Sequence, residues 1–380
     1  MTQIVLGCVL SFVVTFFLMP IVIRIAHIKN LYDLPDKRKA HTNPTSSLGG
    51  VAIFAGIVIS LLLTMNFGDN NTNFQSYAAC FFIIFILGVI DDIVIISAWK
   101  KVATQLIISI ILSFKAGLLI DNLHGFMGID SLDVVSSHLF TFFTVIVIIN
   151  AFNLIDGIDG LAGSLGVFAS VAFGIFYLIN KDLSYSLLAF SVASSFLGFL
   201  MYNFPPAKIF MGDCGSLLLG LIMSVLAIHF IQTAPTAPVL PIIASPAIAF
   251  GVLLVPLMDA LRVFIIRVSK GLSPFAPDRN HLHHLLIDKG FTHKKVTLTL
   301  LGISALSTVV VFLAQLSLGT TAIISTLVLT FFISVYLLKR YIYGKRRLLH
   351  IVNEADNNDD DHVRVVPIFN PAEKVVTKEE

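Results

Sequence analysis

The chain has few charged residues and few cysteines for its length. Of its 380 residues only 13% are charged and 56% are hydrophobic, with a mean hydropathy of +0.90. A water-soluble domain with a single core does not need so apolar a composition, so that class is excluded. Cys8, Cys80 and Cys214 have no paired spacing, which argues against a disulfide framework and a zinc site. The net charge of +2 gives no sign of a nucleic-acid partner, and we expect none.

Long apolar runs take up most of the sequence. Runs of roughly 18 to 25 residues can cross the hydrocarbon layer as helices, whereas barrel strands would show ~10-residue alternation instead. We therefore predict an all-α polytopic membrane protein with about eleven transmembrane helices. The first run lacks a cleavage-site signature and is expected to be retained as a helix. The runs lie at about 4–26, 48–67, 76–96, 102–120, 135–153, 161–180, 184–203, 212–231, 240–268, 296–316 and 319–340.

Lys and Arg are almost confined to alternate loops, while the intervening loops hold essentially only Lys181. The positive-inside rule then places the N-terminus outside and the C-terminus inside. We expect one transmembrane catalytic domain over residues 1–345 and a poorly ordered cytoplasmic tail over 346–380, which lacks apolar periodicity. The basic segments, which include Lys100-Lys101, are 27–47, 97–101, 204–211, 269–295 and 341–380.

Four polar clusters interrupt the apolar runs, and this threading places all of them at the cytoplasmic face. They are Asp91-Asp92, Asn153 to Gly160, Phe210 to Asp213, and Asp278 to His284. Ionisable side chains at a membrane boundary are costly and therefore indicate a functional site. Carboxylate oxygens suit Mg²⁺ together with substrate phosphates, and Arg279 offers a two-pronged donor to phosphate. The residue types in these clusters suit an anionic, phosphate-bearing donor that reacts with an acceptor at the lipid boundary.

Each cluster by itself also has an ordinary structural explanation. Paired aspartates at a helix end are often interfacial caps, an Asp-Gly pair signals a turn, and a histidine-rich basic loop is more often solvated than catalytic. A secondary transporter would also carry buried acids, but near the midplane and on paired repeats. No repeat of fixed period is visible, and the clusters share one face, which favours an enzyme.

Five motifs occur in a fixed order along the chain. They are Asp33-x-Pro35-x-x-Arg38-Lys39-x-His41 ending in Gly49-Gly50, then Asp91-Asp92, then Asn153-x-x-Asp156-Gly157-x-Asp159-Gly160, then Phe210-Met211-Gly212-Asp213-x-Gly215-Ser216, then Asp278-Arg279-x-His281-x-His283-His284. In this order the chain resembles the polyprenyl-phosphate N-acetylhexosamine-1-phosphate transferases over about residues 20 to 340. Cys214 departs mildly from the fourth motif, where a small hydroxyl residue or Ala is expected.

The resemblance implies transfer of a sugar 1-phosphate from a UDP-N-acetylhexosamine to undecaprenyl phosphate, with release of UMP. The form of the last motif is typical of the branch that uses UDP-GlcNAc; the phospho-MurNAc-pentapeptide transferase of peptidoglycan synthesis remains the alternative. The implied location is the bacterial cytoplasmic membrane, where the product starts a cell-surface glycan that the sequence does not name. A homodimer is left open.

The resemblance also implies a role for individual residues. Asp213 and Asn153 are expected to bind Mg²⁺, for which Mn²⁺ could substitute. Asp91 and Asp92 are expected at the acceptor phosphate as catalytic residues. A further set is expected to bind the donor. At the uridine we expect Asp156, Asp159, Asn203 and Phe210, and Gly212 is expected to bind the donor as well. At the pyrophosphate and sugar we expect Arg279, His281, His283 and His284.

Overall fold

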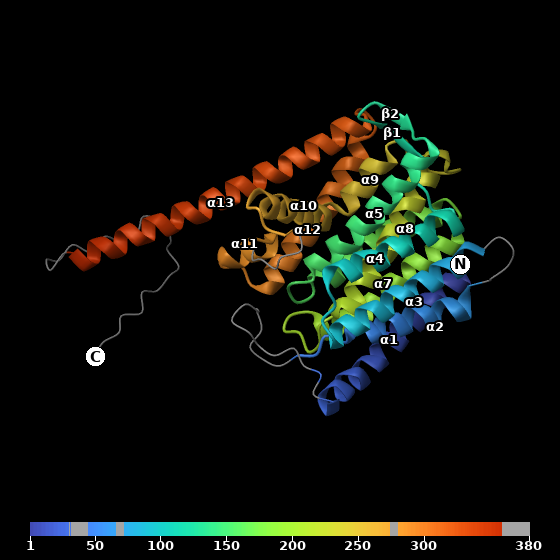
Figure 1. The fold of residues 1–380 in the computed structure, drawn as a ribbon, viewed down its shortest axis with the longest axis horizontal. Helices are drawn as coiled ribbons and strands as arrows, with labels where there is room; N and C mark the ends of the chain where they lie inside the picture. Colours follow the sequence, from blue (N-terminus) through green and yellow to red (C-terminus); the bar gives the residue numbers. More distant parts are fainter. Residues whose placement is uncertain (30, 32–44, 66–71, 274–279, 359–380) are drawn as a thin grey trace. The chain divides into compact units, whose positions relative to one another are not determined.

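The computed structural model describes residues 1–29, 31, 45–65, 72–273 and 280–358, and most of them are helical (Figure 1). Contacts divide the chain into residues 1–331 and residues 332–380, of which the second holds the remainder of the last helix. The helices are α1 (Thr2–Lys29), α2 (Gly49–Thr64), α3 (Thr72–Ile93), α4 (Ala98–Ile110), α5 (Val134–Ile155), α6 (Leu161–Ile179), α7 (Leu183–Asn203), α8 (Gly212–Thr233), α9 (Ser245–Val252), α10 (Leu254–Ser269), α11 (Leu282–Asp288), α12 (His293–Ala314) and α13 (Thr320–Asn358).

All eleven predicted apolar runs coincide with helices. In the described part of the chain, eight helices are long and apolar enough to span a membrane, and the bent pair α9 and α10 would make a ninth. The other two runs form α2, which has 16 residues, and α4, which has 13 and continues into a π-helix over Ile111–Lys115. The polytopic helical class is thus confirmed, while the count of eleven and the orientation stay predictions.

The predicted run 240–268 is broken at Leu253, where α9 and α10 meet at an angle of 80°. Pro256 follows the break and has no N–H to donate to the carbonyl of Val252, so one helical hydrogen bond is missing there. The helix continues in a new direction. As a result of this bend, α10 packs against α5 and α12.

Three features of the described chain were not predicted from the sequence. The loop before α5 contains an antiparallel hairpin of β1 (Asn122–Phe126) and β2 (Ile129–Ser131), so the all-α class needs this correction. The histidine-rich loop contains the short helix α11. Helix α13 continues through Asn358, beyond the predicted start of the tail at 346, whereas residues 359–380 lie outside the described part. Where the tail begins stays a prediction.

Helix α8 forms the centre of the bundle and is almost completely buried, because it is apolar on all sides. It packs against α2, α3, α5 and α6. Small residues allow the close crossings: a Cβ on Gly88 of α3 would lie 2.5 Å from the backbone nitrogen of Cys214. The first turn of α8 is thus held tightly against the last turns of α3, which fixes where Asp213 lies.

Hydroxyl groups join α1, α2 and α7 inside the bundle. Thr15 and Ser195 share a hydrogen bond of 2.7 Å, Ser11 donates to the carbonyl of Ser191 at 2.7 Å, and Ser60 donates to the carbonyl of Gly7 at 2.8 Å. Such bonds satisfy polar groups that water cannot reach in a membrane interior. These bonds hold α1, α2 and α7 together, and α2 in turn packs against α8.

Candidate active site

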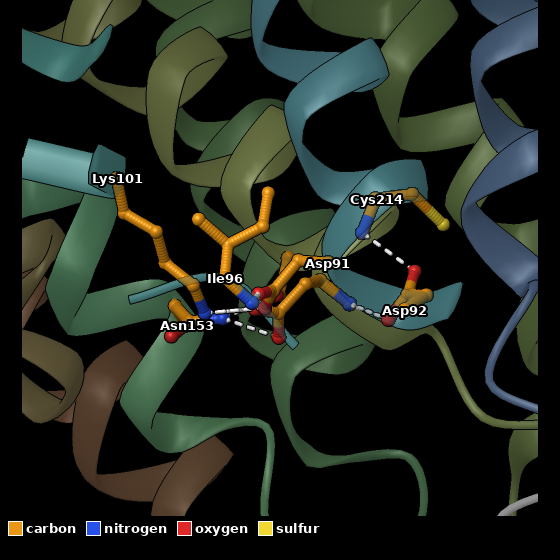
Figure 2. A network of polar contacts seen from close by, with 8 residues as sticks. Asp91, Asp92, Ile96, Lys101, Asn153 and Cys214 are labelled. Atoms are coloured by element: carbon orange, nitrogen blue, oxygen red, sulfur yellow. Dashed lines mark hydrogen bonds and ion pairs between the residues drawn. The ribbon is translucent and has the colours of Figure 1, made fainter. Parts of the chain in front are cut away.

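One polar cluster lies where the end of α3, the start of α4, the end of α5 and the start of α8 meet (Figure 2). The ammonium of Lys101 forms ion pairs with the carboxylates of Asp91 and Asp213, at 2.6 Å from Asp213 Oδ2. Asn153 Nδ2 donates to Asp213 Oδ1 at 2.9 Å and to Ser216 Oγ at 3.0 Å. The structure thus brings together Asp91, Asn153 and Asp213, three of the predicted site residues.

Lys101 was not among the predicted site residues. In the sequence it counted only toward the positive-inside pattern, because a basic pair beside an apolar run is the usual topology signal. Its neighbour Lys100 is exposed and fits that role. Lys101 instead points into the cluster, one position further along the helix. Lys101 could have been found from its charge, because two buried carboxylates that lie close together need a positive partner.

Asp92 points to a different partner from Asp91. Its Oδ1 accepts a hydrogen bond from the backbone N–H of Asp213 at 2.7 Å, and its Oδ2 accepts one from the N–H of Cys214 at 3.0 Å (Figure 2). A carboxylate in this place caps α8 and interacts favourably with the positive end of the helix. Gly212 has a φ of +73°, and a Cβ there would lie 2.7 Å from Asp92 Oδ2. Asp92 and Gly212 therefore set the position of Asp213.

We expect Asp92→Ala to weaken the start of α8 by roughly 1 to 2 kcal/mol, the usual effect of losing a cap, and to lower turnover because Asp213 moves. Asp92→Asn should fall between Ala and wild type, because the amide oxygen still accepts one bond. Melting temperature and turnover of purified protein measure this. If Asp92→Asn lost all turnover with an unchanged melting temperature, the carboxylate would act in the chemistry itself.

The segment from Asp156 to Gly160 connects α5 to α6 beside this cluster. Burial, followed by the nearby charges of Asp213, Asp92 and Asp159, raises the pKa of Asp156 to about 8. No described residue donates a hydrogen bond to its carboxylate. Beside it, Asp91 and Asp213 carry two carboxylates against the single ammonium of Lys101, which favours a bound cation.

Asp159 and Asn203 hold the neighbouring loops together. Asp159 Oδ2 accepts from the backbone N–H of Ala207 at 3.2 Å and lies 3.6 Å from His293 Nδ1. Asn203 Oδ1 accepts from the N–H of Gly160 at 2.9 Å, and its Nδ2 donates to the carbonyl of Ile209 at 2.8 Å. The amide oxygen and the amide nitrogen of Asn203 thus each bond to backbone and join the start of α6 to the segment before α8, while its contact with the donor stays a prediction.

Phe210 lies in the segment that precedes α8. Its backbone N–H donates to the carbonyl of Ser46 at 2.8 Å, and its carbonyl accepts from Gly49 at 3.0 Å. The ring is half-buried. These bonds bring the start of α2, where the first sequence motif ends, to the same end of the bundle as Asp213; the earlier residues of that motif lie outside the described part.

The histidine motif reaches the site through His283. This side chain is 1% exposed, and a Cβ on Gly157 would lie 2.5 Å from its Nε2, so only glycine fits against the ring. Burial lowers the pKa of His283 to about 3, which leaves the imidazole neutral. Within the described residues, its Nδ1 has no hydrogen-bond partner. The ring of His284 lies 4.4 Å from that of His283, and Arg279 lies outside the described residues.

The oxygen atoms at the cluster could hold a hard divalent cation, with Asp91 and Asp213 as carboxylate donors. Asn153 turns its amide nitrogen to Asp213, so its oxygen would become a third donor after the amide turns over. In the described part of the chain no three His, Cys, Asp or Glu side chains form a complete metal site. Mg²⁺ in proteins takes one or two carboxylates and completes its shell with water and substrate phosphates.

Comparison with known proteins agrees with the motifs. Residues 74–231 match the model of glycosyl transferase family 4. An undecaprenyl-phosphate alpha-N-acetylglucosaminyl 1-phosphate transferase of Haemophilus influenzae is 33% identical over 80% of this chain and 86% of its own length. A probable undecaprenyl-phosphate N-acetylglucosaminyl 1-phosphate transferase of Bacillus subtilis is 32% identical over 79% of this chain and 82% of its own length. These matches confirm the predicted resemblance, and the chain belongs to glycosyl transferase family 4.

Proposed function

We propose that this enzyme transfers N-acetylglucosamine 1-phosphate from UDP-GlcNAc to undecaprenyl phosphate and releases UMP. The observation that carries the proposal is the Lys101 ammonium between the carboxylates of Asp91 and Asp213, at the ends of membrane helices. This arrangement suits two anionic phosphates that must meet at a lipid surface. The relatives are named for the same transfer.

In the proposed reaction an oxygen of the acceptor phosphate attacks the β-phosphorus of the donor. The bond from that phosphorus to the bridging oxygen breaks, and UMP leaves with the oxygen and its electron pair. The lipid keeps a pyrophosphate that carries the sugar. Because the acceptor is already an anion near neutral pH, the barrier comes mainly from charge repulsion, so the site must neutralise and align the two phosphates.

We propose that Asp213, Asn153 and Asp91 hold Mg²⁺ or Mn²⁺. The raised pKa of Asp156 supports this, because buried carboxylates that crowd together are relieved by a cation. A bound divalent ion would neutralise charge on the pyrophosphate. Lys101 would then supply a second positive charge for the phosphates, and Asp91 would face the acceptor phosphate.

The donor is proposed to lie across the loops beside this cluster. The segment from Asp156 to Gly160 and the ring of Phe210 would form the uridine side. The rings of His281, His283 and His284, with Arg279 just before them in the chain, would face the pyrophosphate and the sugar. The lipid chain would lie among the exposed apolar faces of the helices, so that chemistry takes place at the boundary.

A panel of UDP-sugars tests the donor. Purified enzyme in undecaprenyl phosphate micelles should make lipid-linked product and UMP from UDP-GlcNAc, with much lower rates from UDP-glucose, which lacks the acetamido group. UDP-MurNAc-pentapeptide, the donor of the peptidoglycan enzyme, is included to test that alternative. Efficient use of that compound in place of UDP-GlcNAc would overturn the choice of branch.

We further propose that the site faces the cytoplasm, as the basic loops indicate. In a variant without the native cysteines, Met127→Cys at the exposed tip of the hairpin should react with an impermeant thiol reagent in intact cells. Lys294→Cys, exposed at the start of α12, should react only after the cells are opened. Labelling of Lys294→Cys in intact cells would reverse the orientation.

A further inference from the structure

We infer that Asp259 is a positioning residue that fixes the orientation of His281 in the donor site, an inference that rests on the proposed function. Asp259 lies on α10, outside all five sequence motifs, and is 1% exposed. An unpaired carboxylate buried to this degree would be costly, so its partners show what it does.

Each oxygen of Asp259 has its own partner in the histidine motif. Oδ1 accepts a hydrogen bond of 2.7 Å from the backbone N–H of Leu282, at the start of α11. Oδ2 lies 2.8 Å from Nδ1 of His281. One turn further along α10, Arg262 donates through Nη1 to the carbonyl of Asn280. The first oxygen and Arg262 hold the backbone of the motif, whereas the second oxygen acts on the imidazole ring alone.

The contact to the ring sets its protons. A carboxylate only accepts, so Nδ1 of His281 must carry the proton and donate it to Asp259. Nε2, the other ring nitrogen, takes no part in this contact. In the neutral ring Nε2 is an acceptor, and in the charged ring it is a donor. Orientation of a histidine by a buried aspartate in this way is the arrangement by which catalytic histidines are commonly held.

A stack of rings connects this pair to the proposed donor site. The rings of His281 and His283 are nearly parallel, with centroids 5.4 Å apart and an angle of 8°. His283 in turn lies against Gly157, in the segment that begins beside Asp213 and Asn153. A turn of the His281 ring would therefore disturb His283, which packs against the segment from Asp156 to Gly160.

Asp259→Asn separates the two functions of this carboxylate. The Asn oxygen can still accept from Leu282, but its amide nitrogen then faces His281 and requires Nδ1 without a proton. Nitrogen-15 NMR of histidine-labelled enzyme at pH 8, with the His281 signal identified by its loss in His281→Gln, should report a proton on Nδ1 in wild type and on Nε2 in the variant. We expect kcat to fall about 10- to 100-fold, the usual effect of removing a supporting partner, with an unchanged KM for undecaprenyl phosphate.

Asp182→Asn is the matched control. Asp182 Oδ2 pairs with His229 Nε2 at the same distance of 2.8 Å, at the other end of α8 from Asp213. The loss of this pair should leave kcat unchanged. A further measurement uses His281→Asn, whose amide can still donate to Asp259 but which has no counterpart of Nε2. If Asp259 acts through His281, adding Asp259→Asn to that variant should cost no further activity.

The inference would be overturned if Asp259→Asn and Asp182→Asn lowered kcat by the same factor. It would also be overturned if the effects of Asp259→Asn and His281→Asn on kcat were fully additive, because Asp259 would then have only a structural role. If Asp259→Asn does not fold, His281→Asn decides, since wild-type kinetics in that variant also overturns it. A wild-type enzyme without transfer to undecaprenyl phosphate would instead refute the proposed function, while the NMR result would still test the hydrogen bond.

Discussion

Asp213→Asn is expected to lower turnover roughly 1,000-fold, the upper range for loss of one electrostatic group at a reacting centre. The amide keeps the shape of the side chain, and the backbone N–H of residue 213 can still donate to Asp92. It cannot, however, supply the negative charge that a hard cation needs. Turnover of the purified variant is measured with saturating UDP-GlcNAc and undecaprenyl phosphate.

Asp130→Asn is the control for this change, because Asp130 is exposed in β2 and its loss alters the net charge equally. It should retain wild-type turnover. A chelator should also abolish wild-type activity, and added Mg²⁺ or Mn²⁺ should restore it. Wild-type turnover in Asp213→Asn, together with activity in the presence of chelator, would remove the metal from the mechanism.

Lys101→Met is expected to lower turnover about 100-fold, because it removes the ammonium that lies between the carboxylates of Asp91 and Asp213. In the metal-free protein the variant should also melt at a lower temperature, since two neighbouring carboxylates lose their counter-charge. Mg²⁺ should raise the melting temperature of the variant more than that of wild type, because the ion takes over this neutralisation.

Lys100→Met provides the matched control, since Lys100 is the exposed neighbour on the same helix. It should leave both turnover and the response to Mg²⁺ unchanged. Equal effects of the two substitutions would mean that Lys101 contributes only to the general positive charge of this surface, and the ion pairs would then carry no function.

The helices were predictable because the length of an apolar run is dictated by the thickness of the bilayer. The hairpin of β1 and β2 and the helix α11 were missed because each is short and is held by residues distant in the sequence: Met127 donates to Thr321, and Leu282 donates to Asp259. Met127 at the hairpin turn is an example: it has a φ of +54°, which its residue type does not indicate. The bend between α9 and α10 had a visible signal in Pro256, within the predicted run 240–268.

The site was predictable in part, for a similar reason. Asp91, Asn153 and Asp213 stood out because polar groups at a membrane boundary need partners, and the structure brings them together. The same rule applied to Asp92 could not distinguish a helix cap from a catalytic group, because that depends on which way the side chain turns. Asp259 is an acid within an apolar run and could have been found by this rule.

The destination of the β-phosphorus tests the central claim most directly. UDP-GlcNAc labelled with ³²P at the β-phosphate is incubated with the enzyme and undecaprenyl phosphate, and the lipid and aqueous phases are then separated. If a sugar 1-phosphate is transferred, the label should appear in the lipid and the released UMP should carry none. Label that stays in the aqueous phase as UDP, with sugar in the lipid, would show transfer of the sugar alone and would contradict the account.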